Sequence, residues 1–211
     1  MAPPLERPLF ARVAAACLVV LTIAGQAGCV FVAVWAIWGR SVPRYESRFT
    51  SEDYAVAMAE LRAARTPQDR YYALADAAKT TVYFGSLEDA EAYARELLDL
   101  AERQSRCWNL GNALHDGHMV LGLVALRRGD VETAKAQLLL AGDTPGSPQL
   151  DSFGPNPSLA RELIERGERD AAIAYFERIR GFWEMERGRL DAWTADVRAG
   201  RSPDFGATLI H

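Results

Sequence analysis

The chain has 211 residues, of which 49% are hydrophobic and 25% are charged, a balance that excludes an extensively disordered protein. Its formal net charge is −4, so it lacks the excess of Lys and Arg that attracts phosphates, and no nucleic-acid partner is expected. Two of the three cysteines, Cys17 and Cys29, lie in an apolar N-terminal stretch; only Cys107 lies beyond it, which excludes a disulfide framework there.

The N-terminal stretch between Arg12 and Arg40 reads VAAACLVVLTIAGQAGCVFVAVWAIWG and holds no charged residue. As a helix with a rise of about 1.5 Å per residue, its 27 residues would be roughly 40 Å long, which exceeds the ~30 Å hydrocarbon core of a bilayer. Trp35 and Trp38 stand near its end, where amphipathic rings favour the headgroup level. The sequence therefore predicts that this stretch is the transmembrane helix of a single-pass protein of the cell membrane.

Two other interpretations of the same stretch stay open. The run AGQAGC has small residues at alternate positions, as a signal-peptide cleavage site does. A lipoprotein signal also ends in a cysteine, although Gln26 stands where that pattern usually has an aliphatic residue. Either cleavage would leave VFVAVWAIW on the mature chain, which favours an uncleaved helix. Arginines flank both ends, so the side of the membrane on which the rest of the chain lies is left undecided.

Beyond residue 50, apolar residues recur with helical periodicity, and no run of β-branched residues indicates a sheet. Ser51, followed by Glu52 and Asp53, is a candidate helix N-cap, and Thr66 before Pro67 is another. We therefore expect an all-α protein. Its expected segments are a tail at 1–12, the transmembrane helix at 13–39, a linker at 40–50, a helical domain at 51–200 and a C-terminal tail at 201–211.

Three segments within residues 67–187 share one pattern, in which a helical stretch, a turn glycine, a polar residue and a second helical stretch follow one another. The turn glycines are Gly85, Gly129 and Gly167. Small residues recur at matching distances from these turns, namely Ala78, Gly122 and Ala160 before them and Ala90, Ala134 and Ala172 after them. Small side chains at these positions let two helix axes approach closely, while larger apolar residues one turn away fill the gap.

This spacing resembles that of the tetratricopeptide repeat, a family of antiparallel helical hairpins that stack side by side. The resemblance implies a short α-solenoid after the membrane helix, in which each hairpin covers the apolar face of its neighbour. The turn glycines are 44 and then 38 residues apart, instead of the family's period of about 34, so the regularity of the stack stays open. The C-terminal half also resembles a loose group of uncharacterised bacterial proteins, which implies no activity.

The stretch HDGH at residues 115–118 allows two interpretations. His115 and His118 share one helical face, so two imidazoles could reach one ion, and a metal-binding or hydrolytic domain centred here is the alternative function. Zinc needs at least a third protein ligand, however, and Cys107 lies about two helical turns upstream. We therefore expect packing histidines beside an exposed Asp116, without a metal or a cofactor.

Other catalytic patterns are equally weak in the sequence. It contains no phosphate-binding glycine loop and no G-x-S-x-G motif around a nucleophilic serine. Carboxylates alternate with arginines in RELIERGERD at residues 161–170, a pattern typical of a solvated helical face. The sequence therefore favours a protein without catalytic activity, although it does not decide whether the chain is an enzyme.

In tetratricopeptide repeats the first helix of each hairpin lines the concave face, and the resemblance carries this role to the matching positions here. Aromatic and apolar groups interleaved with a few charges suit a peptide better than a small metabolite. The expected protein-binding residues are Tyr72, Lys79, Tyr83, Trp108, Asn109, Asn112, Asp116, Met119, Arg127 and Arg161. Ordinary core packing is the alternative role for each. The expected function is a membrane-anchored interaction or scaffold module, whose partners are another protein or peptide and, through the N-terminal helix, the membrane.

Overall fold

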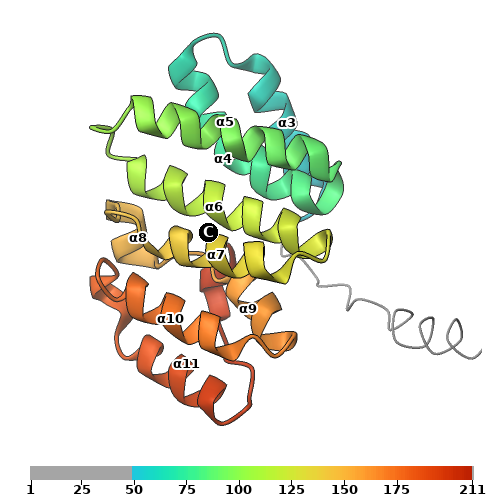
Figure 1. The fold of residues 1–211 in the computed structure, drawn as a ribbon. Coiled ribbons are helices and arrows are strands. Elements are labelled where there is room, and N and C mark those ends of the chain that lie inside the picture. The colour runs from blue at the N-terminus through green and yellow to red at the C-terminus, as the bar shows by residue number, and fades with distance from the viewer. Residues whose placement is uncertain (1–48, 211) are drawn as a thin grey trace, which may run out of the picture. The chain divides into compact units, whose positions relative to one another are not determined.

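The computed structural model of the chain describes residues 49–210, where every regular element is helical and no strand occurs. Figure 1 shows these helices laid beside one another in chain order. They are α3 (Ser51–Ala63), α4 (Pro67–Phe84), α5 (Leu87–Arg103), α6 (Leu110–Arg127), α7 (Val131–Gly142), α8 (Pro148–Phe153), α9 (Ser158–Glu165), α10 (Arg169–Ile179) and α11 (Arg189–Arg198), with 3₁₀ turns η1 (Glu184–Glu186) and η2 (Gly206–Ile210).

The helices begin where the sequence supplies capping side chains. Thr66 caps α4: its hydroxyl accepts a hydrogen bond from the Asp69 backbone N–H at 3.1 Å, and the Asp69 carboxylate accepts one from the Thr66 N–H at 3.0 Å. Pro67 takes the first helical position. An N–H group there has no partner within the helix, so proline, which lacks one, loses no hydrogen bond. Ser51 was predicted to cap α3, but the N-cap is Thr50. Thr50 forms the same two reciprocal hydrogen bonds with Asp53, the third residue of the helix.

The three turn glycines join the hairpins α4–α5, α6–α7 and α9–α10. Gly129 and Gly167 have φ angles of +85° and +92°, a conformation that glycine adopts easily because it has no Cβ atom. Gly85 ends α4 with an extended backbone instead. In each case the chain reverses within a few residues, so the second helix packs against the first.

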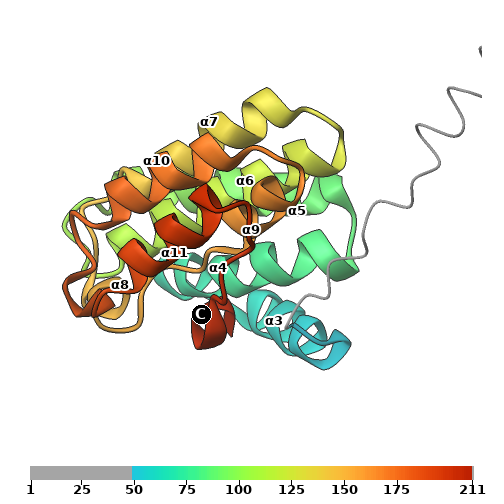
Figure 2. The same ribbon diagram turned by 90° about the horizontal axis from the view of Figure 1, so that it is seen from below.

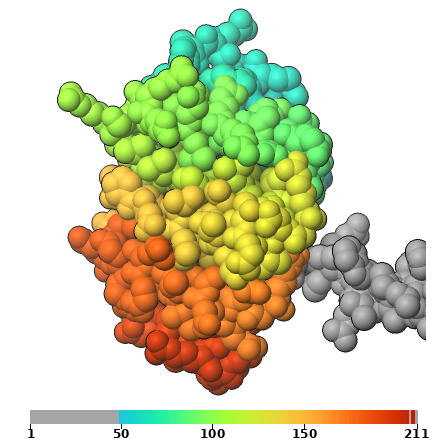
Figure 3. Space-filling model, viewed as in Figure 1, coloured from blue at the N-terminus to red at the C-terminus, as the bar shows by residue number. Residues whose placement is uncertain are grey.

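Neighbouring hairpins also pack against one another. α4 contacts α6, and α6 contacts α9, while α7 contacts α10. Figure 2 shows α7 and α10 on one side of the domain and α4 toward the opposite side. In the space-filling view, successive segments form adjacent bands with no gap between them (Figure 3). The prediction of an all-helical domain with stacked adjacent helices is confirmed, and this arrangement is compatible with a helical-repeat fold.

Small residues lie at the closest approaches between the helices. Five of those that the sequence singled out are fully buried, namely Ala78, Ala90, Ala134, Ala160 and Ala172. At the sixth position, a Cβ atom on Gly122 would lie 2.2 Å from Leu159 Cδ2, so any larger residue would require the Leu159 side chain to shift. The spacing of small residues therefore reflects close helix packing, as expected.

The core has two parts. A smaller apolar cluster lies among α3, α4, α5 and the start of α6, and a larger one extends from α4 to the last described residues. The C-terminal end of the larger cluster is aromatic: ring centroids lie 4.8 Å apart for Trp193 and Phe205, and 5.6 Å apart for Phe176 and Trp193. Phe205 and Leu209, from the segment expected as a C-terminal tail, are both buried. These last residues therefore close the end of the core.

The membrane part of the predicted architecture is corrected. Between residues 49 and 210, no helix is long and apolar enough to cross a lipid bilayer. α6 has the length of a short span, but it carries Asp116 and Arg127, and such charges are costly in hydrocarbon. The segment 13–39, for which the transmembrane helix was predicted, lies outside the described residues. The fold class is therefore a helical stack with no membrane-spanning helix among its described elements, and the single-pass cell-membrane localisation is not retained.

Candidate functional site

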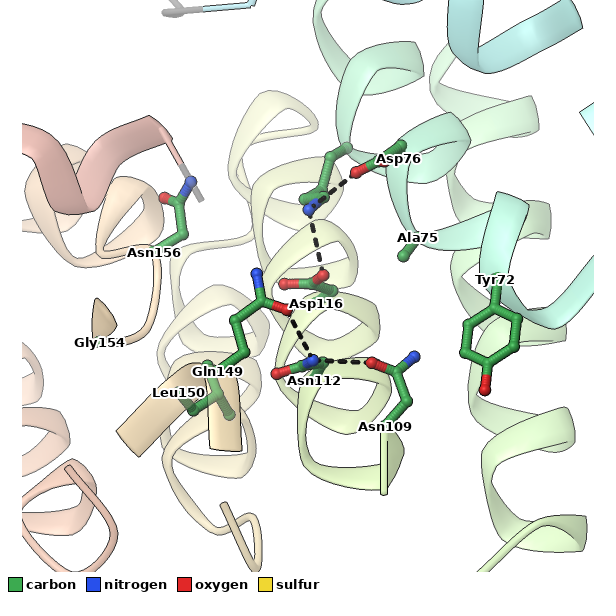
Figure 4. Close-up of a pocket in the computed structure, with 11 residues that line it drawn as sticks. Tyr72, Ala75, Asp76, Asn109, Asn112, Asp116, Gln149, Leu150, Gly154 and Asn156 are labelled. Atoms are coloured by element: carbon green, nitrogen blue, oxygen red, sulfur yellow. Dashed lines mark hydrogen bonds and ion pairs between the residues drawn. The ribbon is translucent and has the colours of Figure 1, made fainter. Parts of the chain in front are cut away.

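A pocket of about 190 Å³, here named the polar recess, lies where α4, α6 and α8 meet (Figure 4). Three segments that are distant in the sequence supply its lining. The lining residues are Tyr72, Ala75, Asp76 and Lys79 of α4, Asn109, Asn112 and Asp116 at and within α6, and Gln149, Leu150, Gly154 and Asn156 of α8 and the loop that follows it. Most of these side chains are polar, which is unusual for the interior of a helical stack.

Helical periodicity explains how two helices each present several of these side chains. Tyr72, Asp76 and Lys79 follow one another at intervals of four and three residues on α4, and Asn112 and Asp116 are four apart on α6. Such intervals bring side chains onto one face of a helix. The polar recess forms where these two faces meet, and α8 closes one side of it.

The charged floor of the polar recess is an ion pair that is almost removed from water. Lys79 Nζ lies 3.0 Å from Asp76 Oδ1 and 3.2 Å from Asp116 Oδ2, and both Lys79 and Asp116 are only 8% exposed. Burial alone would lower the pKa of Lys79, but the carboxylates of Asp116 and Asp76 outweigh it and raise this pKa above its ordinary value. Burial alone would raise the pKa of Asp116, but the charge of Lys79 and the bond to His115 outweigh it and lower this pKa. Both partners are therefore ionised at neutral pH.

The expectation that Asp116 faces solvent is wrong. Its Oδ1 lies 3.2 Å from His115 Nδ1, and His115 Nε2 lies 3.0 Å from the Tyr175 hydroxyl on α10. Burial raises the pKa of Tyr175, so the phenol keeps its proton. Asp116 is buried because α4 packs against its side of α6 and brings Lys79 against the carboxylate. A chain of polar contacts thus leads from the polar recess across α6 to α10.

The amide side of the polar recess is a hydrogen-bonded network centred on Asn112. Its Nδ2 donates to Asn109 Oδ1 at 2.7 Å and to Gln149 Oε1 at 3.0 Å, and its Oδ1 accepts from the Ser147 hydroxyl at 2.6 Å. The side-chain nitrogens of Asn109 and Gln149 point away from Asn112 (Figure 4). The network therefore uses the oxygens of these two amides and leaves their N–H groups out of it.

An aromatic pair lies beside the polar recess: Tyr72 lines the recess, and Trp108, which is not part of the lining, packs on Tyr72. The Tyr72 and Trp108 rings are stacked with centroids 6.2 Å apart and planes 27° apart. Tyr72 is 40% exposed and Trp108 is 59% exposed, so a large part of both rings faces solvent. The Tyr72 hydroxyl lies 3.7 Å from Cys107 Sγ, a weak contact that ties the ring to the segment before α6. Exposed aromatic side chains with restricted positions are common binding residues at protein interfaces.

Three other residues predicted to bind a partner lie together but do not line the polar recess. Arg127 pairs with Glu162, and the Arg127 guanidinium carbon lies 6.0 Å from the centre of the Tyr83 ring. Burial, together with the charge of Glu162, raises the pKa of Tyr83 to about 12. Arg161 has a buried Nε without a hydrogen-bond partner in the described structure. Glu162 itself is fully buried, so the expectation that residues 161–170 form a wholly solvated face is wrong.

The remaining predicted residues have packing roles. Met119 is buried in the larger core cluster. His118 Nδ1 lies 2.8 Å from Gln137 Oε1 on α7, whereas His115 bonds toward α10, so the two imidazoles are directed to different partners. Within residues 49–210, no group of three or more His, Cys, Asp or Glu side chains is placed to hold a metal ion.

Sequence reasoning did not find three polar residues of the polar recess: Asp76, Gln149 and Asn156. For Asp76 a signal was present, because it lies four residues after Tyr72 and three before Lys79, both of which were predicted to bind. Gln149 and Asn156 belong to a Pro- and Gly-rich segment without helical periodicity. Their position depends on how α8 folds back against α6, which the contacts alone reveal.

No protein-family model, no curated protein and no solved structure matches this chain. A function therefore has to be inferred from the residues themselves and from the geometry of the polar recess.

Proposed function

We propose that the helical domain is a protein-interaction module that binds an extended segment of another protein at the polar recess and has no catalytic activity of its own. The observation that carries the proposal is that half of the binding residues predicted from the sequence line this one pocket. The tetratricopeptide-like spacing of the hairpins supports it too, because such stacks use the face formed by their first helices to bind peptides.

The size and chemistry of the polar recess favour a peptide over a metabolite. Its volume of about 190 Å³ is below the roughly 300–1,000 Å³ of most small-molecule sites, but it can take one side chain and its flanking peptide groups. Amide side chains such as Asn109 and Gln149 both donate and accept hydrogen bonds, as peptide groups do. The exposed rings of Tyr72 and Trp108 supply apolar contact area beside these polar groups.

The geometry around His115 supports a binding role instead of a hydrolytic one. Its imidazole is almost fully buried, and its two nitrogens lie within hydrogen-bond distance of Asp116 and Tyr175. A general base must reach the proton that it removes from a substrate. Here both nitrogens already have protein partners, and His115 is not among the residues that line the polar recess.

The proposal is tested by selecting a library of random seven-residue peptides against the full-length chain and measuring the dissociation constants of the enriched peptides. Gln149→Ala removes an exposed group that lines the polar recess, and Trp108→Ala removes the exposed ring that stacks on the lining residue Tyr72. We expect Trp108→Ala to weaken binding about tenfold, because exposed aromatic residues of this kind contribute on the order of 1–2 kcal/mol to an interface.

Leu140→Ala is the matched control, since Leu140 is also an exposed large hydrophobic residue but lies on α7. It should leave the affinity unchanged, and the three variants should keep the melting temperature of the parent chain. Failure to enrich any peptide would refute the proposal. So would enriched peptides that bind both recess variants as tightly as the parent chain.

A further inference from the structure

A shallow hollow adjoins the polar recess on the side of α3. It lies between α3 and α4, and it shares Tyr72 and Asp76 with the polar recess. The residues that line this hollow are Glu60, Ala63, Ala64, Asp69, Tyr72, Ala73 and Asp76. Three of them carry a carboxyl group and none carries a basic side chain. Arg62 and Arg65 are close in sequence but are not part of the lining.

The carboxyl groups of the hollow are accessible to a ligand. The side-chain bond from Thr66 and the backbone N–H groups of Arg65 and Thr66 hold the pKa of Asp69 below its ordinary value. The side chain of Asp76 is 61% exposed although one of its oxygens contacts Lys79. Lys79 contacts Asp116 as well as Asp76, so its single positive charge is shared between two carboxylates. It therefore cancels little of the negative charge where the hollow meets the polar recess. The region where the hollow and the polar recess meet, at Tyr72 and Asp76, is therefore negatively charged.

An aromatic surface lies directly beside these carboxylates. Tyr72 is one helical turn from Asp76 on the same face of α4, and Trp108 stacks on Tyr72. The negative face of an aromatic ring attracts a cation, and a nearby carboxylate adds to that attraction. A guanidinium group can stack flat on a ring and form paired hydrogen bonds with a carboxylate at the same time.

We infer that the partner segment carries an arginine whose guanidinium group lies against the Tyr72–Trp108 pair and forms an ion pair with Asp76. This inference rests on the proposed function and names the chemical class of its ligand, a basic peptide. An acidic peptide would meet like charge from Glu60, Asp69 and Asp76, which disfavours its binding. The peptide groups on either side of the arginine lie over the amides of the polar recess.

The experiment uses the peptides enriched by the full-length chain. We expect arginine to be over-represented at one position of the enriched peptides. Replacing that arginine with citrulline, which has the same shape but no charge, should raise the dissociation constant about tenfold, because a cation–π contact and an exposed ion pair act together. Affinity for the arginine peptide should also fall as the salt concentration rises.

Asp76→Asn identifies the carboxylate that is responsible. In this variant we expect the citrulline-to-arginine ratio of dissociation constants to fall to about threefold, because only the aromatic contact remains. Asp170→Asn is the matched control: Asp170 is an exposed aspartate on α10, and the ratio should stay at its parent value. A general loss of folding would weaken both peptides alike and would leave the ratio unchanged.

The two proposals fail in different ways. Enriched peptides that require Trp108 and Gln149 but bind equally well with citrulline would overturn the arginine inference and leave the proposed function intact. An unchanged ratio in an Asp76→Asn variant that binds the citrulline peptide as tightly as the parent chain would likewise overturn the assignment to that carboxylate. If the library enriches no peptide at all, the proposed function and the inference are both refuted.

Discussion

Two carboxylates of this domain, Glu162 and Asp116, lie where water hardly reaches, and each is held by a cation from another helix. Glu162 is 0% exposed and pairs with Arg127, whose side chain is 22% exposed. Asp116 pairs with Lys79, which is as deeply buried as itself. Removal of an ion from water costs several kcal/mol, and only a close partner offsets that cost. At the residue scale these pairs fix which faces of the helices meet.

Loss of the Glu162 carboxylate should destabilise the fold. Glu162→Ala leaves Arg127 without its buried partner and opens a small cavity between α6 and α9. We expect the free energy of unfolding to fall by about 3 kcal/mol, near the lower end for a broken buried pair because Arg127 can partly regain water. Urea denaturation measures this loss. Glu165→Ala, an exposed glutamate one turn along α9, is the control and should change stability by less than about 0.5 kcal/mol.

The Asp116–Lys79 pair should make stability depend on acid pH. The folded-state pKa of Asp116 is lowered from its ordinary value of 3.8, so its stabilising contribution is fully present above about pH 4 and is lost as the pH falls through the lowered value. We expect Asp116→Asn to lower the melting temperature at pH 7 and the difference from the parent chain to shrink toward pH 3. Asp99→Asn, at an exposed helical position, is the control. A difference that stays constant from pH 7 to pH 3 would contradict the lowered pKa.

At the scale of elements, the position of α8 and its approach to α6 determine the shape of the polar recess. The first turn of α6 lies directly against the loop that precedes α8, and a Cβ atom on Gly111 would be 1.9 Å from the Gly146 carbonyl oxygen. Ser147, next in the chain, caps α8 and also bonds to Asn112. Glycine at position 111 therefore allows the contact from which the amide network of the polar recess is built.

Gly111→Ala tests this contact, because the contact decides whether the substitution raises or lowers the free energy of unfolding. Without a clash, alanine in a helix would stabilise the chain by about 1 kcal/mol relative to glycine. Here the added methyl group meets backbone atoms, so we expect a net loss of about 1–3 kcal/mol in the free energy of unfolding. The same variant should weaken binding of the enriched peptides, since the loop that carries Ser147 must move. A variant more stable than the parent chain would show that the loop yields without cost.

At the scale of the whole domain, a stack of hairpins has two ends, and each end needs a cover for its apolar face. At the C-terminal end that cover is α11 with the segment after it. Trp193 and Phe205 pack edge to face, and the Trp193 indole N–H donates to the Asp204 carbonyl oxygen at 3.2 Å. Asn156, which lines the polar recess, donates to the Leu209 carbonyl oxygen at 3.3 Å. The end of the stack is thereby connected to the wall of the polar recess.

Phe205→Ala should therefore destabilise the domain as much as a central core substitution. Phe205 is almost completely buried between α10 and α11, and loss of a buried phenylalanine ring typically costs about 3–5 kcal/mol. Urea denaturation should show this loss. Phe153→Ala is the matched control, because the Phe153 side chain is largely exposed, and it should change stability by less than about 1 kcal/mol. Equal effects of the two substitutions would refute a core role for the C-terminal segment.

Much of the fold follows from local rules. Helical periodicity, the capping residues and the turn glycines are properties of short segments, so they predict where helices begin, end and reverse. Burial of Ala78, Ala134 and Ala172 also follows, since a small residue on the apolar face of a helix has few other uses. The predicted transmembrane helix was argued in the same local way, from length and apolar content, but none of the described helices has both properties.

The polar recess was predictable only in part. Tyr72, Lys79 and Asp116 were predicted because the resemblance to tetratricopeptide repeats assigns binding to the first helices, and Asn112 because it lies just ahead of the matching positions on α6. Their contacts with one another were not predicted: Asp116 on α6 pairs with Lys79 on α4, 37 residues away in the sequence. Helical spacing gives the direction in which a side chain points around the axis of its helix. It does not say which neighbouring helix packs on that side.

The sequence by itself determined that this domain is made of helices, where its hairpins turn, and which small residues bring the helices together, because these properties depend on neighbours a few positions away. The tertiary structure decided that Asp116 and Glu162 are buried ions instead of solvated ones. It also decided that α8 and the loop that follows it complete the polar recess and that the last described residues close the core. Those outcomes depend on which charges and surfaces meet after the helices pack, and contacts between distant segments leave no periodic trace in one sequence.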